Sequence, residues 1–220
     1  MCGRFTLTQT PDALAQLFGA VLANDLPDLP DYNICPTARV LSVVSAGGGR
    51  RIGAMRWGFL PHWYKSPTDG PLLINARAET IADKPAFRSA VRKRRCLIPA
   101  DGFYEWEKDD EGRRLPWYVT RSDGAPMIFA GVWQMWGPEE ARIPACAIVT
   151  TGAGPDVETI HHRQPVILDP GQWGLWLGEE GTGAVKCLQA APQGSLTATR
   201  VDPRVNSNRA SGAELVRPLA

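Results

Sequence analysis

The second residue of the chain is a cysteine, directly behind the initiator methionine. Aminopeptidases remove Met1 when the next side chain is small, and the chain then begins with Cys2, which carries a free α-amine and a thiol on adjacent carbons. Such an aminothiol condenses with an aldehyde through its amine, and its thiol then closes a five-membered thiazolidine ring. The alternative is that Cys2 is a small buried apolar residue without a chemical role, because the reactivity of a cysteine depends on its surroundings.

A carboxylate lies inside the aromatic segment PADGFYEWE at residues 99–107. If this segment is a strand, Phe103 and Glu105 share one face, and Tyr104 and Trp106 share the other. Glu105 is then either a solvated residue on the face of the strand or an acid whose pKa is raised by an apolar wall. The segment alone leaves both interpretations open.

Polar residues also follow the apolar residues 72–74 in the segment LLINARAET. Asn75, Arg77 and Glu79 come directly after what reads as a buried strand, and polar groups at such a strand end often line a site. The alternative for Asn75 is that it caps a helix that follows it.

Two of the three histidines are adjacent, in TIHHRQPVIL at residues 159–168. Either His161 or His162 can act as a general acid and base, because imidazole titrates near neutral pH. On a strand the two side chains point to opposite faces, and no third ligand stands at a recognisable spacing, so a metal site is not expected. Arg163 beside them is suited to contact an anion.

Two further segments combine positive charge with aromatic or helical context. The proline-bounded loop at 57–67 carries Trp63, Tyr64 and Lys65, which suit base stacking and phosphate contact or, alternatively, a core cluster under the loop. The run RKRR at 92–95 is either the solvated end of a helix or a phosphate contact.

The elements that must position these residues are mainly strands. Helical spacing is expected at 11–21, 78–93 and 169–177, and short apolar runs predict strands at 40–45, 51–59, 95–107, 115–120, 127–136 and 144–151. Turn sequences between the runs favour hairpins over strand–helix alternation. We therefore predict an α+β fold in one domain, residues 1–220, with a largely antiparallel, barrel-like β core and a few peripheral helices. Only the GTGAVK region and the last dozen residues look loose.

Composition narrows the class of protein. The 220 residues are 44% hydrophobic with a net charge of +1, so any anion-binding surface has to be local. Five widely spaced cysteines form no C-x-x-C pair, which disfavours a disulfide framework or a zinc site. No signal peptide or membrane span is visible near the start. These features predict a reduced, cytoplasmic protein.

Six motifs in order resemble one known family. MCGRF, YNICP, RWGFLPHW, INARAET, CLIPADGFYEW and IHHRQPVIL, followed by NRASGAEL near the end, are similar to the SRAP (SOS-response-associated peptidase) family of abasic-site processing proteins. The resemblance spans essentially the whole chain. It implies that Cys2, freed of Met1, forms a thiazolidine crosslink with the ring-opened aldehyde of an abasic site in single-stranded DNA. It further implies no cofactor, no membrane, a monomer, and a location near the nucleoid and replication forks.

The same resemblance assigns roles to individual residues. The catalytic set that it implies is Cys2, Asn75, Glu105 and His161. The DNA-binding set is Arg4, Asn33, Arg77, Thr150 and Arg163, with Trp63 and Tyr64 as a wedge that interrupts base stacking. The sequence departs from the family pattern at three positions: His162 stands where an acid is common, Gln164 follows the arginine, and Tyr64 replaces a second tryptophan.

Two other classes of function remain open at this stage. An N-terminal-nucleophile amidohydrolase would use the same freed Cys2 to attack an amide carbonyl, but it leaves the aromatic loop and the arginines unexplained. A non-covalent module for single-stranded DNA would use those features and leave Cys2 incidental. The peptidase activity that the family name implies is either limited to removal of the residue before Cys2 or extends to cleavage of other peptides. Lyase activity is a further expectation.

Overall fold

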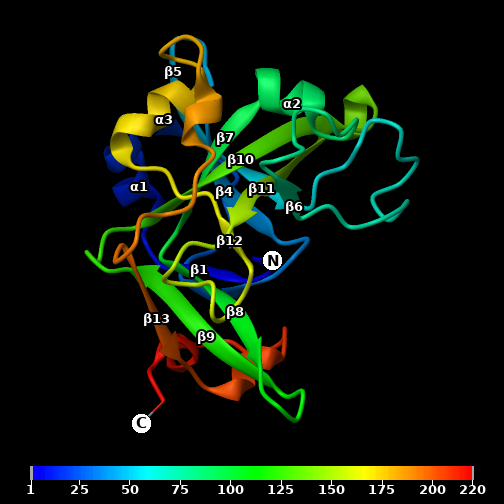
Figure 1. Ribbon diagram of the computed structural model, residues 1–220. Helices are drawn as coiled ribbons and strands as arrows, with labels where there is room; N and C mark the ends of the chain where they lie inside the picture. Colours follow the sequence, from blue (N-terminus) through cyan, green and yellow to red (C-terminus); the bar gives the residue numbers. More distant parts are fainter. Residues whose placement is uncertain (1, 220) are drawn as a thin grey trace.

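The structure, a computed structural model, describes residues 2–219. Strands dominate this range, with three α-helices and four short 3₁₀ segments beside them (Figure 1). The strands are β1 (Phe5–Leu7), β2 (Ala20–Leu22), β3 (Asp31–Ile34), β4 (Arg39–Ala46), β5 (Gly49–Trp57), β6 (Asn75–Arg77), β7 (Arg95–Ala100), β8 (Gly102–Lys108), β9 (Arg114–Arg121), β10 (Met127–Trp136), β11 (Ile143–Gly152), β12 (Arg163–Pro165) and β13 (Leu196–Arg200). The helices are α1 (Pro11–Phe18), α2 (Arg88–Lys93) and α3 (Pro170–Leu177), and the 3₁₀ segments are η1 (Glu139–Ala141), η2 (Ala184–Cys187), η3 (Pro203–Asn206) and η4 (Ala213–Val216).

Five strands of the larger sheet close into a ring. The sheet has the order β12-β11-β10-β7-β4-β5-β2, and β11 also pairs in parallel with β5, through Ala145 opposite Arg56 and Cys146 opposite Trp57. Hydrogen-bonded pairs therefore lead from β11 through β10, β7, β4 and β5 back to β11. Most pairs in the structure are antiparallel, and the exceptions within residues 2–219 are β2–β5, β5–β11 and β6–β11. The predicted α+β fold with a barrel-like, largely antiparallel core is confirmed.

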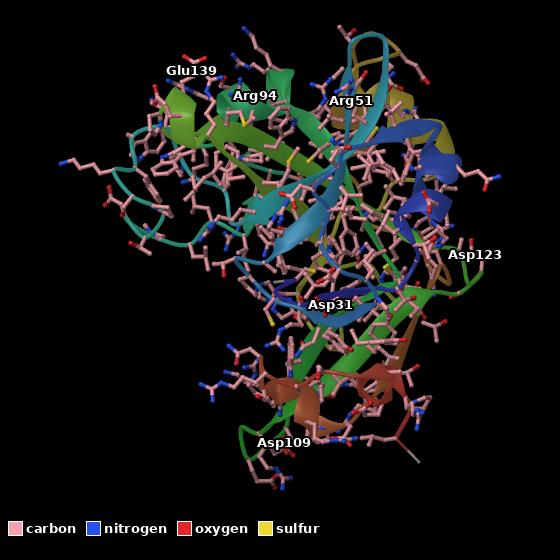
Figure 2. All side chains as sticks on the ribbon, turned by 180° about the vertical axis from the view of Figure 1, so that it is seen from behind. Asp31, Arg51, Arg94, Asp109, Asp123 and Glu139 are labelled. Atoms are coloured by element: carbon pink, nitrogen blue, oxygen red, sulfur yellow. The ribbon has the colours of Figure 1, made fainter. Side chains whose placement is uncertain are left out.

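A smaller antiparallel sheet, in the order β13-β9-β8-β1-β3, lies below the ring in Figure 1. It joins the first strand of the chain to the long β8–β9 hairpin. Figure 2 places Asp109 at the tip of that hairpin, at the opposite end of the molecule from Arg51 on β5. The hairpin pairs with β1 through β8, and its tip extends away from the ring (Figure 2).

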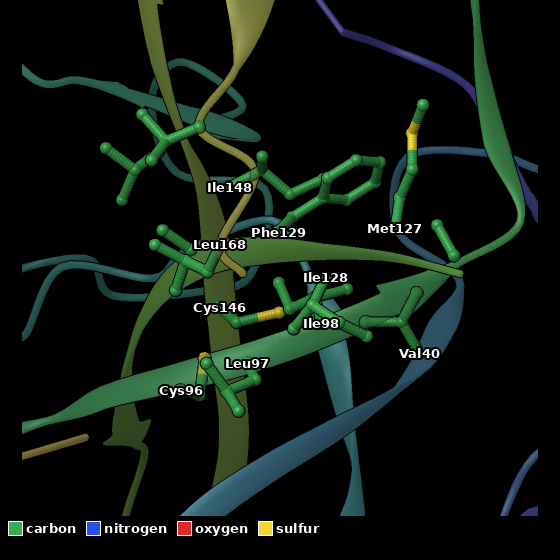
Figure 3. Close-up of a cluster of buried hydrophobic side chains, with 14 of the residues drawn as sticks. Val40, Cys96, Leu97, Ile98, Met127, Ile128, Phe129, Cys146, Ile148 and Leu168 are labelled. Atoms are coloured by element: carbon green, nitrogen blue, oxygen red, sulfur yellow. The ribbon is translucent and has the colours of Figure 1, made fainter. Parts of the chain in front are cut away.

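The core is apolar and fully enclosed where β7, β10 and β11 lie side by side. Ile98, Phe129 and Cys146 expose no surface there, and Figure 3 shows them among other buried side chains. Burial of a large apolar side chain stabilises the fold by about 1.5–3 kcal/mol, so this cluster fixes the frame that carries the site.

A second, smaller core covers the outer face of the five-stranded sheet. Tyr104 and Tyr118 pack there against Val205 and Leu215 from the C-terminal segment. Leu215 is 1% exposed, and the main chain near the end is tied to β13 because the N–H of Leu219 donates to the carbonyl of Arg200. The prediction that the last dozen residues are loose is therefore wrong for this segment.

Helix α1 begins where its capping residue predicts, whereas α2 does not. The hydroxyl of Thr10 accepts the N–H of Ala13 at 3.2 Å, and α1 ends at Gly19, which adopts a left-handed φ of 58°. The helix expected at 78–93 is shorter than predicted: turns occupy its first part and α2 begins only at Arg88, because Pro85 interrupts the helical hydrogen bonds. No helix within residues 2–219 is long and apolar enough to cross a membrane.

Candidate active site

Cys2 lies directly before β1, and β8 runs antiparallel beside that strand. Phe5 stands opposite Phe103, and the N–H of Tyr104 donates to the carbonyl of Arg4 at 2.9 Å. This pairing, continued toward the start of the chain, sets residue 3 opposite residue 105 and brings Glu105 beside Cys2. Glu105 is only 2% exposed and Cys2 exposes no surface, so the solvated interpretation of Glu105 is wrong.

Strand β6 holds Asn75 against the same point. β6 runs parallel to β11 with Asn75 opposite Ile148, and the Asn75 Nδ2 donates to the carbonyl of Cys2 at 2.9 Å. The Asn75 Oδ1 is buried and has no hydrogen-bond partner among residues 2–219. It is therefore available to a donor that enters the site. The capping alternative is wrong, because the next α-helix begins only at Arg88.

His161 completes this group. Its Nδ1 lies 3.9 Å from Glu105 Oε1, 3.0 Å from the N–H of Arg163 and 3.2 Å from the carbonyl of Arg163. The main-chain N–H of Arg163 donates to Nδ1 when that nitrogen carries no proton, and the carbonyl of Arg163 accepts from Nδ1 when it does. The main chain of Arg163 thus offers Nδ1 a partner in either state, which suits a group that gains and loses a proton. Burial lowers the pKa of His161, so the neutral ring predominates at pH 7.

Burial sets the protonation of the two acids at the centre. It raises the pKa of Glu105, because an apolar surrounding disfavours the carboxylate. Burial, followed by the negative charge of Glu105, raises the pKa of the Cys2 thiol far above its ordinary value. The thiol is therefore protonated at neutral pH and needs a base when it reacts. The neighbouring carboxylate is placed to be that base.

The two histidines do not point to opposite faces. Their rings stack, with centroids 4.4 Å apart and planes inclined by 26°. The expectation from strand alternation is wrong because β12 begins only at Arg163, so both histidines lie in the turn before the strand. His162 is the exposed member, and its pKa is lowered chiefly by the neighbouring charge of His161.

Two residues expected to contact phosphate are occupied inside the protein. The Arg163 guanidinium makes a two-point ion pair with Glu79, at 2.7 and 3.0 Å, and donates to the carbonyl and hydroxyl of Thr150. Arg163 is 9% exposed and Thr150 exposes no surface. Both residues thereby hold the main chain that partners His161, and their contact with DNA stays a prediction.

Asn33 is likewise turned inward. It is 7% exposed, its Oδ1 accepts from Arg4 Nη1 at 2.7 Å, and its Nδ2 donates to the carbonyls of Ser207 and Ala210. Its amide groups are thus engaged within the protein, and its contact with DNA stays a prediction. Arg4 keeps part of its guanidinium at the surface, and its further acceptors are the neutral carbonyls of Val205 and Ser207.

Of the remaining predicted contacts, Arg77 and Trp63 are exposed and Tyr64 is half-buried. Arg77 is exposed and lies two residues from Asn75 on β6, so both side chains extend from the same face of the strand. Trp63 is 47% exposed on the loop after β5, with its ring 6.4 Å from that of Tyr64. The Tyr64 hydroxyl donates to the carbonyl of Pro71, which fixes that ring against the loop. The alternative of a buried cluster is wrong for Trp63.

A pocket of about 300 Å³ opens beside Glu105 and His161. It is lined by Gly3, Arg4, Glu105, Trp106, Lys108, Arg114 and His161. Sequence reasoning missed four of these residues: Gly3, Trp106, Lys108 and Arg114. The motif GFYEW contains Trp106, but nothing in the sequence shows that the ends of the β8–β9 hairpin turn their charges toward the start of the chain. No group of side chains within residues 2–219 is arranged to hold a metal ion.

The family description for SRAP, SOS response associated peptidase, matches residues 1–208 of the chain. The protein belongs to the SRAP family. The match stops short of η4, yet the segment beyond it belongs to the same structure, since the Ala210 carbonyl accepts from Asn33 and Leu215 is buried.

Relatives of this SRAP protein span bacteria and mammals. The chain is 35% identical over 223 residues to abasic site processing protein YoqW of Bacillus subtilis, covering 98% of this chain and 99% of the relative. It is 29% identical to abasic site processing protein YedK of Escherichia coli over the full length of both. It is 30% identical to abasic site processing protein HMCES of Rattus norvegicus, covering 99% of this chain and 76% of the relative.

Solved structures agree with the SRAP fold seen here. A protein from Bacteroides thetaiotaomicron matches over the whole of both chains with a TM-score of 0.86 at 21% identity. A protein from Bordetella bronchiseptica matches with a TM-score of 0.79 at 26% identity, covering 91% of this chain and all of that one. The arrangement of strands is thus shared at low sequence identity.

Proposed function

We propose that this SRAP protein processes abasic sites in single-stranded DNA, and that after removal of Met1 it becomes covalently linked to the lesion through Cys2. The observation that carries the proposal is the convergence of Asn75, Glu105 and His161 on the start of the chain. The names of the relatives, abasic site processing proteins, supply the class of substrate.

The chemistry follows from the groups around Cys2. Its freed α-amine, with an ordinary pKa of about 7.7–8.0, is partly unprotonated at neutral pH and attacks the aldehyde carbon of the opened sugar. The carbinolamine that forms loses water to give an imine. The thiol then adds across the C=N bond, so that sulfur bonds to carbon, the proton passes to nitrogen, and the thiazolidine ring closes.

Glu105 serves both proton transfers in this sequence. Its raised pKa enlarges the protonated fraction of the carboxyl group, and this protonated acid donates to the departing hydroxyl of the carbinolamine. The carboxylate left behind is beside the Cys2 thiol and takes its proton as sulfur attacks. One buried acid thereby acts first as an acid and then as a base.

His161 and Asn75 act on the sugar and the amine. His161 donates a proton to the ring oxygen when the sugar opens and takes it back in reversal, with the main chain of Arg163 as partner to Nδ1 in both states. The Asn75 amide holds the Cys2 carbonyl, and its buried Oδ1 accepts a hydrogen bond from the amine once Met1 is removed. The hydrogen bond from Asn75 thereby orients the first residue before chemistry begins.

Arg77, Arg4 and the Trp63–Tyr64 pair provide the contacts to the strand. The exposed Trp63 ring, with the half-buried Tyr64 ring beside it, replaces base stacking that an abasic position lacks, and arginines contact phosphates without reading sequence. With a net charge of +1, the chain has little bulk attraction for duplex, which favours single strands as they occur near replication forks. The proposal includes action as a monomer.

Intact-mass analysis after incubation with an abasic single-stranded oligonucleotide tests the proposal. We expect a protein that lacks Met1 and carries the mass of the strand minus one water, in an adduct that survives heat and denaturant. Cys2→Ala should remove the stable adduct and leave only an imine that borohydride traps. Cys35→Ala, at a half-buried cysteine outside the site, is the matched control.

The other activities are separate outcomes of the same experiment. Cleavage of the strand at the lesion would show lyase activity, and removal of Met1 during incubation of purified precursor would show peptidase activity on its own N-terminus. Strand binding that is unchanged in Cys2→Ala, with no covalent product in the parent, would favour the non-covalent module. Hydrolysis of a simple amide without affinity for DNA would favour the amidohydrolase.

A further inference from the structure

The pocket beside Glu105 and His161 is rich in positive charge that no carboxylate neutralises. Arg4, Lys108 and Arg114 all line it, and none of the three forms an ion pair with an acidic side chain within residues 2–219. By contrast, Arg113, next along the same hairpin, binds Asp109 at 2.6 Å and Glu111 at 2.7 Å. The charges that face the pocket are therefore available to an external anion.

Trp106 organises two of these cations. The guanidinium carbon of Arg114 lies 4.6 Å from the centre of the Trp106 ring, and that of Arg4 lies 5.6 Å from it. The indole N–H donates to Asn206 Oδ1 at 2.5 Å, and the Asn206 amide reaches the carbonyl of Arg114 at 3.4 Å. The ring is thus anchored by the C-terminal segment and supports guanidinium groups on its face.

The acidic group in the same pocket does not cancel this charge. Glu105 is almost fully buried at the inner end, and its pKa is raised by that burial, so its ionised fraction is reduced. Lys108 and Arg114 are exposed at the outer end, on β8 and β9. The pocket therefore runs from a proton-transfer group inside to a cationic rim outside.

We infer that Lys108 and Arg114, supported by Trp106, form a site for a backbone phosphate next to the abasic sugar. This inference rests on the proposed function, because a sugar held at Glu105 and His161 carries a phosphate on each side. A guanidinium presents two parallel N–H groups that match two phosphate oxygens, whereas lysine adds a point charge. Such a contact sets the position of the sugar relative to Cys2 without reading a base.

Binding to a strand that carries a tetrahydrofuran, a stable abasic analogue that cannot open, tests the site without covalent chemistry. We expect Arg114→Gln to weaken binding by about tenfold, as for loss of a charge-assisted hydrogen bond. The slope of log Kd against log salt concentration should fall by about 0.7 for each phosphate contact that is lost. In the double variant Lys108→Gln/Arg114→Gln it should fall by about 1.4. Arg113→Gln is the matched control and should change neither quantity.

A neutral methylphosphonate placed at one phosphate at a time locates the contact. At one position beside the lesion, the methylphosphonate should weaken binding by the parent protein. The same methylphosphonate should cause little further loss of affinity in Arg114→Gln, which has already lost the contact. The inference is overturned if Arg114→Gln has the same affinity and salt slope as Arg113→Gln. It is also overturned if, at every phosphate, the affinity lost to the methylphosphonate adds to the affinity lost in Arg114→Gln. If the parent forms no covalent adduct with a true abasic strand, the proposed function fails instead, and the two failures are thereby distinguished.

Discussion

The side-chain amide of Asn75 donates a hydrogen bond to the main-chain carbonyl of Cys2 across 2.9 Å. This contact joins β6, which pairs with β11 of the ring of strands, to the first described residue of the chain, which precedes β1 of the smaller sheet. The start of the chain is therefore held from both sides, by Asn75 on one and by the β1–β8 pairing on the other.

Asn75→Asp tests this hold with almost no change in shape. Aspartate cannot donate to the Cys2 carbonyl and brings a negative charge near Glu105, so we expect slower adduct formation in single-turnover assays. Loss of a buried donor should lower the free energy of unfolding by about 1–3 kcal/mol. Asn24→Asp, at an exposed asparagine, is the control. Equal adduct rates in the two variants would contradict the role of Asn75.

Glu105→Gln should stabilise the fold while removing function. Because the pKa of Glu105 is raised in the folded protein, the native state holds this proton at pH values where the unfolded state, with an ordinary pKa of about 4.3, has lost it. The stability of the parent therefore falls as pH rises between the two values. Glutamine cannot ionise, so the variant should melt at a higher temperature near neutral pH and match the parent at pH below about 4. Higher stability of the parent at neutral pH would contradict the buried-acid assignment.

Much of the frame was predictable because local signals and tertiary contacts agree. The strand expected at 127–136 has those bounds in the structure, and the start of α1 follows from Thr10 and Pro11. Alternation along β8 likewise predicted that Phe103 and Glu105 share a face. Whether that face is buried depends on β1, which no local pattern in 99–107 reveals.

The surroundings of the site were harder to predict for the same reason. The inward turn of Asn33 depends on the carbonyls of Ser207 and Ala210, more than 170 residues away in sequence. The ion pair of Arg163 depends on Glu79. The stacking of His161 and His162 depends on where β12 begins, and a shift of a strand start by a few residues reverses any argument from alternation.

Arg77→Gln and Arg163→Gln should have different effects. Arg77 is exposed, so its loss should reduce the salt slope of single-strand binding by about 0.7 and leave the melting temperature unchanged. Arg163 is inside the protein, so its loss should lower the melting temperature and leave the salt slope unchanged. Isothermal binding at several salt concentrations, with thermal melting of both variants, checks this. A reduced salt slope in Arg163→Gln with parental melting would show that the arginine leaves Glu79 to bind phosphate.

The stacked histidines give the last prediction. His161→Ala should slow opening of the sugar or reversal of the adduct by about 10²–10⁴-fold, as for loss of a general acid and base. His162→Ala should remain within a few-fold of the parent, because its ring is exposed and Glu105 lies beside His161.

His162→Asp separates a stacking role from an electrostatic one. A carboxylate there favours the imidazolium form of His161 and raises its lowered pKa, so the pH profile should move to higher pH, whereas His162→Asn should leave it in place. Rates from single-turnover crosslinking across pH 5–9 provide the measurement. A shift in His162→Asn as large as that in His162→Asp would assign the effect to lost stacking, and greater damage in His162→Ala than in His161→Ala would reverse the assignment of the two residues.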